Sequence, residues 1–145
     1  MRVTFPRLPD HERAWALVER DDGVVFRRYS GTAGPRLPHD IMHLVVEREL
    51  RISDGIWAGI AAGDPGQPPG QRAELLADLV AAAAALGPLT LEKIKRLTAD
   101  KLGALPDVNM DPVLVAVAAR ALQVEAARWA RLRVGEELSY DWPGK

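Results

Sequence analysis

Residues 14–29 have the sequence AWALVERDDGVVFRRY, in which two runs of strand-forming residues flank a short polar connection. β-branched and aromatic side chains favour strands, and Asp21-Asp22-Gly23 ends in the glycine that a tight hairpin loop needs. The stretch therefore predicts an antiparallel β-hairpin. Alternation along its first strand places Trp15 and Leu17 on the same face.

Both ends of the chain carry the same alternating pattern. Apolar and polar residues alternate over residues 2–5 (RVTF) and again over residues 138–142 (LSYDW). A period of two is typical of a strand with one buried face. We expect residues 138–142 to join the N-terminal strands in one small antiparallel sheet.

The region between these strands predicts about five helices. The first spans residues 39–51, after Pro38, and Ser53 is the expected N-cap of a short second helix that runs through Ile60. The Gly- and Pro-rich residues 63–70 form a connection. The other helices are expected at residues 71–86, 91–105 and 112–133. Thr90 is the expected N-cap of the second of these and Asp111 that of the third. The fold class is therefore α+β, with residues 1–145 as a single domain.

Composition excludes several classes of function. The chain has 145 residues with 19 Lys and Arg against 20 Asp and Glu, and this balance predicts no nucleic-acid partner. It contains no cysteine, which excludes disulfides, thiolate zinc sites and iron–sulfur clusters. No apolar run is long enough for a membrane span, and no signal peptide is apparent. We expect a cytoplasmic protein with no membrane partner.

One short segment carries candidate chemistry. Two of the three histidines lie four residues apart in His39-Asp40-Ile41-Met42-His43. Residues i and i+4 are neighbours on one helix face, so both imidazoles could bind one ion, and Glu47 continues the same line by another turn. Two imidazoles and one carboxylate are suitable ligands for zinc or iron(II).

The third ligand is less well defined than the histidine pair. On a straight helix the Cα atoms of His39 and Glu47 are about 12 Å apart, so these two side chains and His43 cannot easily converge on one ion. Asp54 or His11, brought in by the fold, would be a more natural third ligand.

This pattern is similar to the His-Glu-x-x-His helix of zinc metalloproteases, with Asp40 in place of the catalytic glutamate. It resembles more closely the His-Asp-x-x-His motif of the helical ubiquinone-biosynthesis proteins, which adds a glutamate twelve residues after the second histidine. Gly55 stands at that position here, and Asp54 is the nearest substitute. The resemblance covers residues 39–54 and implies that His39 and His43 are metal ligands.

Two functions follow from these observations. The first is a metal-dependent enzyme for hydrolytic or biosynthetic chemistry on a small-molecule substrate. In it His39 and His43 hold zinc or iron(II), Asp54 or Glu47 is the third ligand, and Asp40 orients a ligand or acts as a weak base. The alternative is a non-enzymatic interaction or accessory protein, a homodimer through its Ala-rich helices and exposed aromatic residues. There, His39 caps the helix and His43 is a core residue bonded to a backbone carbonyl.

Overall fold

The computed structural model describes residues 1–64, 66, 68–103 and 110–143. Within this part of the chain there are four strands and five helices, which confirms the predicted α+β class. The strands are β1 (Arg2–Pro6), β2 (Arg13–Glu19), β3 (Val25–Thr32) and β4 (Glu137–Asp141). The helices are α1 (His39–Leu50), α2 (Ile56–Ala61), α3 (Gln71–Ala84), α4 (Leu91–Leu102) and α5 (Pro112–Arg131).

The four strands form one antiparallel sheet in the order β3-β2-β1-β4. β2 and β3 make the predicted hairpin. β4 pairs with the whole of β1, from Arg2 opposite Asp141 to Pro6 opposite Glu137. The prediction that the C-terminal strand closes the N-terminal sheet is therefore confirmed, although the strand lies one residue earlier than expected.

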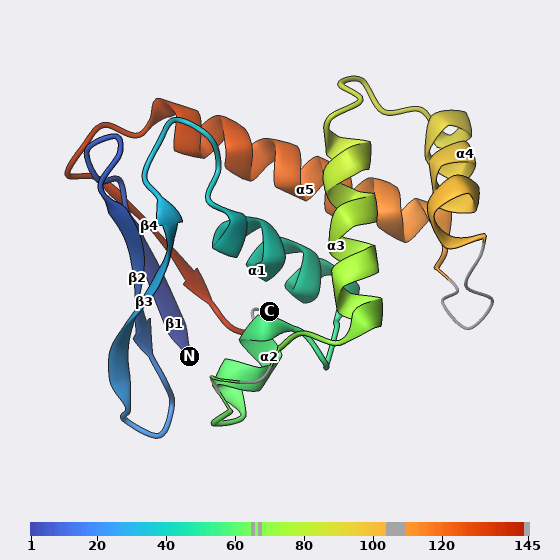
Figure 1. The fold of residues 1–145 in the computed structure, drawn as a ribbon. Helices are drawn as coiled ribbons and strands as arrows, with labels where there is room; N and C mark the ends of the chain where they lie inside the picture. Colours follow the sequence, from blue (N-terminus) through green and yellow to red (C-terminus); the bar gives the residue numbers. More distant parts are fainter. Residues whose placement is uncertain (65, 67, 104–109, 144–145) are drawn as a thin grey trace.

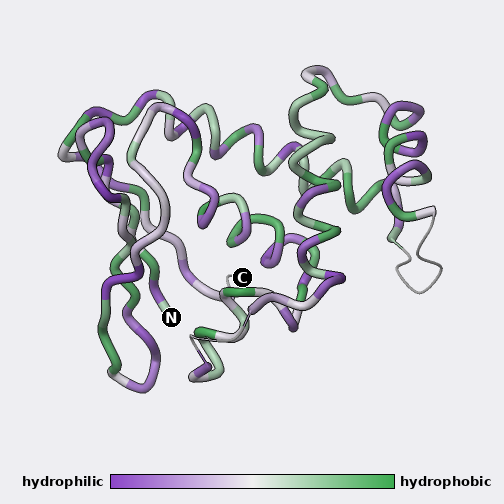
Figure 2. The backbone as a smooth tube through the Cα atoms, in the orientation of Figure 1, coloured by the Kyte–Doolittle hydropathy of each residue, from purple (hydrophilic) through white to green (hydrophobic). Residues whose placement is uncertain are grey.

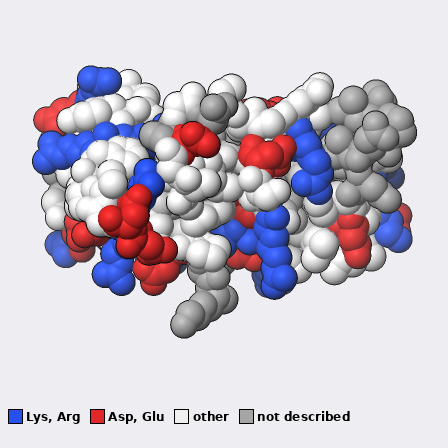
Figure 3. Space-filling view, turned by 90° about the horizontal axis from the view of Figure 1, so that it is seen from below, with Lys and Arg blue, Asp and Glu red and all other residues white. Residues whose placement is uncertain are grey.

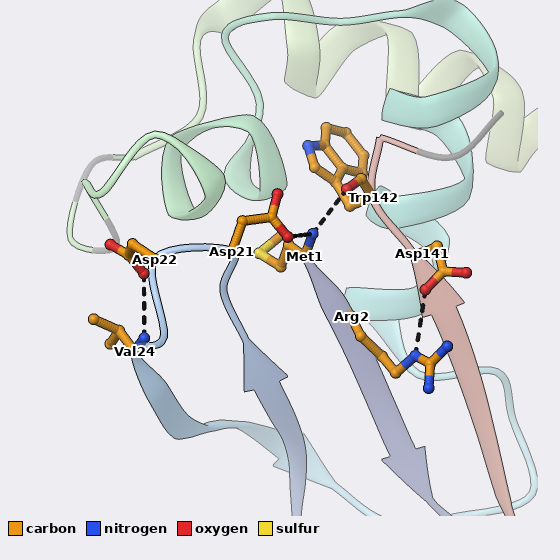
Figure 4. Close-up of polar contacts among 7 residues, drawn as sticks. All are labelled: Met1, Arg2, Asp21, Asp22, Val24, Asp141 and Trp142. Atoms are coloured by element: carbon orange, nitrogen blue, oxygen red, sulfur yellow. Dashed lines mark hydrogen bonds and ion pairs between the residues drawn. The ribbon is translucent and has the colours of Figure 1, made fainter.

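Polar contacts fix the strand ends around the hairpin loop (Figure 4). The backbone N–H of Val24 donates to the carboxylate of Asp22 across 3.2 Å, which closes the loop. The amino group of Met1 donates to Asp21 at 2.6 Å and to the carbonyl of Trp142 at 3.1 Å. The two acidic loop residues thus stabilise both the hairpin and the start of the neighbouring strand.

The helices cover one face of the sheet and leave the other face free of them (Figure 1). α1 is the central helix because it contacts β3, α2, α3 and α5. Hydrophobic and hydrophilic residues alternate along α1 and α5, as expected for helices with one buried face (Figure 2). The α1 side chains that are completely buried are Ile41, Leu44, Val45 and Val46.

Most predicted helix starts are correct. Thr90 accepts a hydrogen bond from the N–H of Lys93, and Asp111 accepts one from the N–H of Val113. The expected cap at Ser53 is wrong, because α2 begins at Ile56 after Gly55. The end of the predicted 91–105 helix, the loop after it and part of the 63–70 connection lie outside the described residues.

The surface carries both signs of charge. Figure 3 shows Lys and Arg side chains next to Asp and Glu side chains over the face seen from below. No helix in the described ranges is long and apolar enough to cross a membrane.

Candidate functional site

The first turns of α1 bring His39 and His43 together. Their Nε2 atoms are 3.3 Å apart, and the ring centroids are 4.4 Å apart with the ring planes inclined at 64°. His39 is exposed, whereas the His43 side chain is only 1% exposed. The two rings lie on one helix face, as the i,i+4 spacing predicts. The pair extends from the surface at His39 into the core at His43.

His43 lies in a buried environment with acidic groups nearby. Burial lowers the pKa of His43, and His39 lowers it further, while Glu74, Asp40 and Asp78 act in the opposite direction. Glu74 Oε1 is 4.0 Å from His43 Nε2. Among the described residues, Nδ1 of His43 has no hydrogen-bond partner. The non-enzymatic alternative expected His43 to bond a backbone carbonyl, and Nδ1 makes no such bond within the described part of the chain.

Asp40 is held in a buried ion pair. Arg28 on β3 donates from Nε to Asp40 Oδ2 across 2.9 Å, and the Asp40 side chain is only 4% exposed. The backbone carbonyl of Asp40 accepts a hydrogen bond from the indole N–H of Trp57 at 2.9 Å. These contacts hold the first turn of α1 to the sheet and to α2. Asp40, which was predicted to orient a ligand or act as a weak base, therefore has a structural role in this fold.

Glu47 caps the start of α2. Its carboxylate accepts hydrogen bonds from the backbone N–H groups of Ile56 at 2.7 Å, Trp57 at 2.9 Å and Ala58 at 3.3 Å. The first N–H groups of a helix have no partner within the helix, and Glu47 satisfies them where Ser53 was expected to do so. Both carboxylate oxygens are thereby engaged, so the Glu47 side chain is directed from α1 to the start of α2 and not to the histidine pair.

Gly55, next to this cap, and Gly70, before α3, have no room for a side chain. A Cβ atom on Gly55 would lie 2.1 Å from the carboxylate carbon of Glu47. This is the position at which the ubiquinone-biosynthesis motif carries its glutamate, and here the carboxylate of Glu47 fills the space. Asp54 faces the start of α3, because a Cβ atom on Gly70 would lie 2.1 Å from Asp54 Oδ2.

The predicted ligand set is therefore only partly assembled. His39 and His43 are together, while Glu47 and Asp54 face other groups and His11 lies in the loop before β2. Within residues 1–64, 66, 68–103 and 110–143, no three His, Asp or Glu side chains are close enough together to hold a metal ion.

Glu74, in the first turn of α3, is an acidic residue beside the pair that the sequence pattern did not reveal. Its only local signal is an acidic residue at a helix start, which the helix dipole explains equally well. Its position beside His43 depends on the packing of α3 against α1 (Figure 1).

A groove of about 540 Å³ adjoins the exposed member of the pair. His39 lines it together with Ser30, Thr32, Arg36 and Pro38, from the end of β3 and the segment that leads into α1. A small molecule in this groove would lie next to the His39 ring.

Comparison of the chain with protein-family models, curated proteins and solved structures found no match.

The substitution Gly55→Ala tests the Glu47 cap. The added methyl group would displace the carboxylate from the α2 N–H groups, so we expect a loss of about 2 kcal/mol or more in the free energy of unfolding, measured by chemical denaturation. Gly34→Ala is the matched control, since a Cβ atom there meets nothing within 4 Å. An unchanged unfolding midpoint for Gly55→Ala would refute the cap.

Stability should also depend on pH through Glu47. Burial raises the pKa of Glu47 from 4.5 to about 7, against the opposing effect of the three N–H groups. Because the folded state holds this proton more tightly than the unfolded chain, the contribution of Glu47 to stability is complete below pH 4.5 and is lost as the pH rises to about 7.

Relative to Glu47→Gln, the wild type should therefore lose up to about 3 kcal/mol of unfolding free energy across this range. Chemical denaturation of both proteins at a series of pH values measures this difference. His43 is common to both proteins, so its titration largely cancels in the difference. Glu49→Gln, an exposed change on the same helix, is the control. Parallel pH profiles for wild type and Glu47→Gln would contradict the expectation.

Proposed function

We propose that the protein binds one divalent transition-metal ion, zinc or iron(II), between Nε2 of His39 and Nε2 of His43, and uses it on a small-molecule substrate. The observation that carries the proposal is the 3.3 Å separation of these two atoms. Nitrogen ligands that are 2.0–2.1 Å from a tetrahedral zinc ion are about 3.3 Å apart. The pair has the spacing of one edge of such a site, and a bound ion would replace the direct contact between the rings.

The electrostatic environment supports a bound cation. A histidine must be neutral to bind a metal, and the lowered pKa of His43 keeps this imidazole neutral at physiological pH. Glu74 and Asp78 on α3 act on His43 as negative charges. These carboxylates favour a positive ion at the pair.

Glu74 is the third protein ligand in this proposal. Its Oε1 atom is 4.0 Å from His43 Nε2, whereas two ligand atoms on a tetrahedral ion are separated by about 3.3 Å. The Glu74 side chain is 44% exposed, so a rotation can bring it closer. The fourth position would hold water or substrate, which a bound ion would polarise as a Lewis acid. A cytoplasmic location is part of the proposal, because the chain contains no cysteine.

The alternative function is a non-enzymatic interaction protein that forms a homodimer. It is favoured by the outer side of α5, where Val113, Val117 and Val124 are 51%, 53% and 53% exposed. Their spacing of four and seven residues puts them on one side of the helix, as in a helix–helix interface. In this alternative the histidine pair binds no metal.

Calorimetric titration separates the two functions. Untagged protein treated with a chelator should bind one zinc ion, or one iron(II) ion without oxygen, per chain. His39→Ala and His43→Ala should abolish this binding, and Glu74→Gln should weaken it about 10- to 100-fold.

Asp78→Asn, one turn along α3, is the matched control for Glu74→Gln and should change the affinity much less. Asp54→Asn should bind like the wild type. Circular dichroism of each variant checks that it is folded. The proposal fails if the wild type binds neither ion more tightly than about millimolar, or if His43→Ala binds as well as the wild type.

A further inference from the structure

The groove beside His39 has the size of a small-molecule site. Its volume of about 540 Å³ lies within the range of about 300–1,000 Å³ that is usual for ligand pockets. Two glycines in its wall, Gly31 and Gly34, leave open space, since a Cβ atom on either would meet nothing within 4 Å. The groove therefore has room for a ligand next to the histidine pair.

The charge of the groove is distinctive. Arg36 supplies a guanidinium group, and none of the described residues that line the groove is acidic. Within the described part of the chain, no acidic side chain lies within ion-pair distance of Arg36, whereas Arg28 is already paired with Asp40. Arg36 is thus an arginine at the groove whose charge is available to a ligand.

Two other surface hollows differ from this groove because acidic side chains line both of them. One, of about 590 Å³, has Glu47 and Glu49 in its lining beside Arg48 and Arg51, so acidic and basic side chains are equal in number there. The other, of about 670 Å³, is lined by more acidic than basic side chains, among them Asp21 and Asp141. Each of these hollows places carboxylates beside a bound anion, whereas the described lining of the groove at His39 contains none, so charge complementarity favours that groove.

Hydroxyl groups complete the polar lining. Ser30 and Thr32, near the end of β3, line the same groove as Arg36. A guanidinium group with its fixed fork of donors, together with hydroxyl donors, is the usual protein environment for a carboxylate or phosphate group. The apolar remainder of the lining, including Leu37, suits a short carbon skeleton.

We propose that the substrate is a small anionic molecule whose carboxylate or phosphate group is bound by Arg36, with Ser30 and Thr32, in the groove beside His39. This inference rests on the proposed function, since the anchored anion places the rest of the molecule next to the metal-binding pair. Arg36 is a specificity-determining residue in this arrangement and takes no part in bond making.

The test is a titration of metal-free protein with inorganic phosphate, with succinate and with neutral succinamide. ¹⁵N–¹H NMR spectra recorded during each titration detect binding. Phosphate or succinate should shift the amide signals of residues 30–39, and the preferred anion identifies the class. Arg36→Ala should weaken that binding by about tenfold or more, and Arg36→Lys should restore part of it. Arg51→Ala, in the hollow that contains Glu47, is the control and should bind the anion like the wild type.

Failure of this inference can be told from failure of the metal site. Arg36→Ala should still bind zinc like the wild type, and His43→Ala, which changes a residue outside the groove lining, should still bind the anion. Equal anion affinity of wild type and Arg36→Ala, or equal response to succinamide, would overturn the anionic substrate even if zinc binds. Anion binding that depends on Arg36 in a protein that binds no metal would support the groove and refute the proposed enzyme.

Discussion

The buried carboxylate of Glu47 determines the path of the chain after α1. Three backbone N–H groups at the start of α2 donate to it, and Gly55 leaves the space that it occupies. This contact fixes the corner between α1 and α2 and places Trp57 in the core, where the side chain is completely buried. Its indole N–H then binds the carbonyl of Asp40, whose carboxylate is paired with Arg28. Both ends of α1 are thus held by buried polar groups.

This arrangement matters for the candidate site because the histidines belong to the part of α1 that is fixed. Asp40 lies in the same part of α1 as both histidines, so the ion pair with β3 and the bond from Trp57 hold the backbone that carries the two rings. In the proposed metal site the two imidazoles are already next to each other, which reduces the cost of ordering them on binding. His39 also lines the groove with Arg36, where a substrate could reach the proposed ion.

Local patterns in the sequence were sufficient for the sheet and for the histidine pair. Period-two alternation identified the hairpin and the last strand, and the spacing of four residues placed His39 and His43 on one helix face. The roles of Glu47 and Glu74 could not be found in this way. Glu47 caps a helix that starts nine residues later, and Glu74 approaches His43 only through the packing of α3 on α1. Both contacts depend on tertiary structure, for which local periodicity carries no information.

X-ray absorption spectroscopy at the zinc edge of the zinc-loaded protein tests the central claim most directly. We expect two imidazole nitrogens at about 2.0 Å from the zinc ion, with the outer-shell scattering of the rings, and oxygen ligands in the remaining positions. His43→Ala should lose one of the two imidazole contributions. A first shell of oxygen atoms alone, without imidazole scattering, would contradict the account and leave the histidine pair as a structural feature of α1.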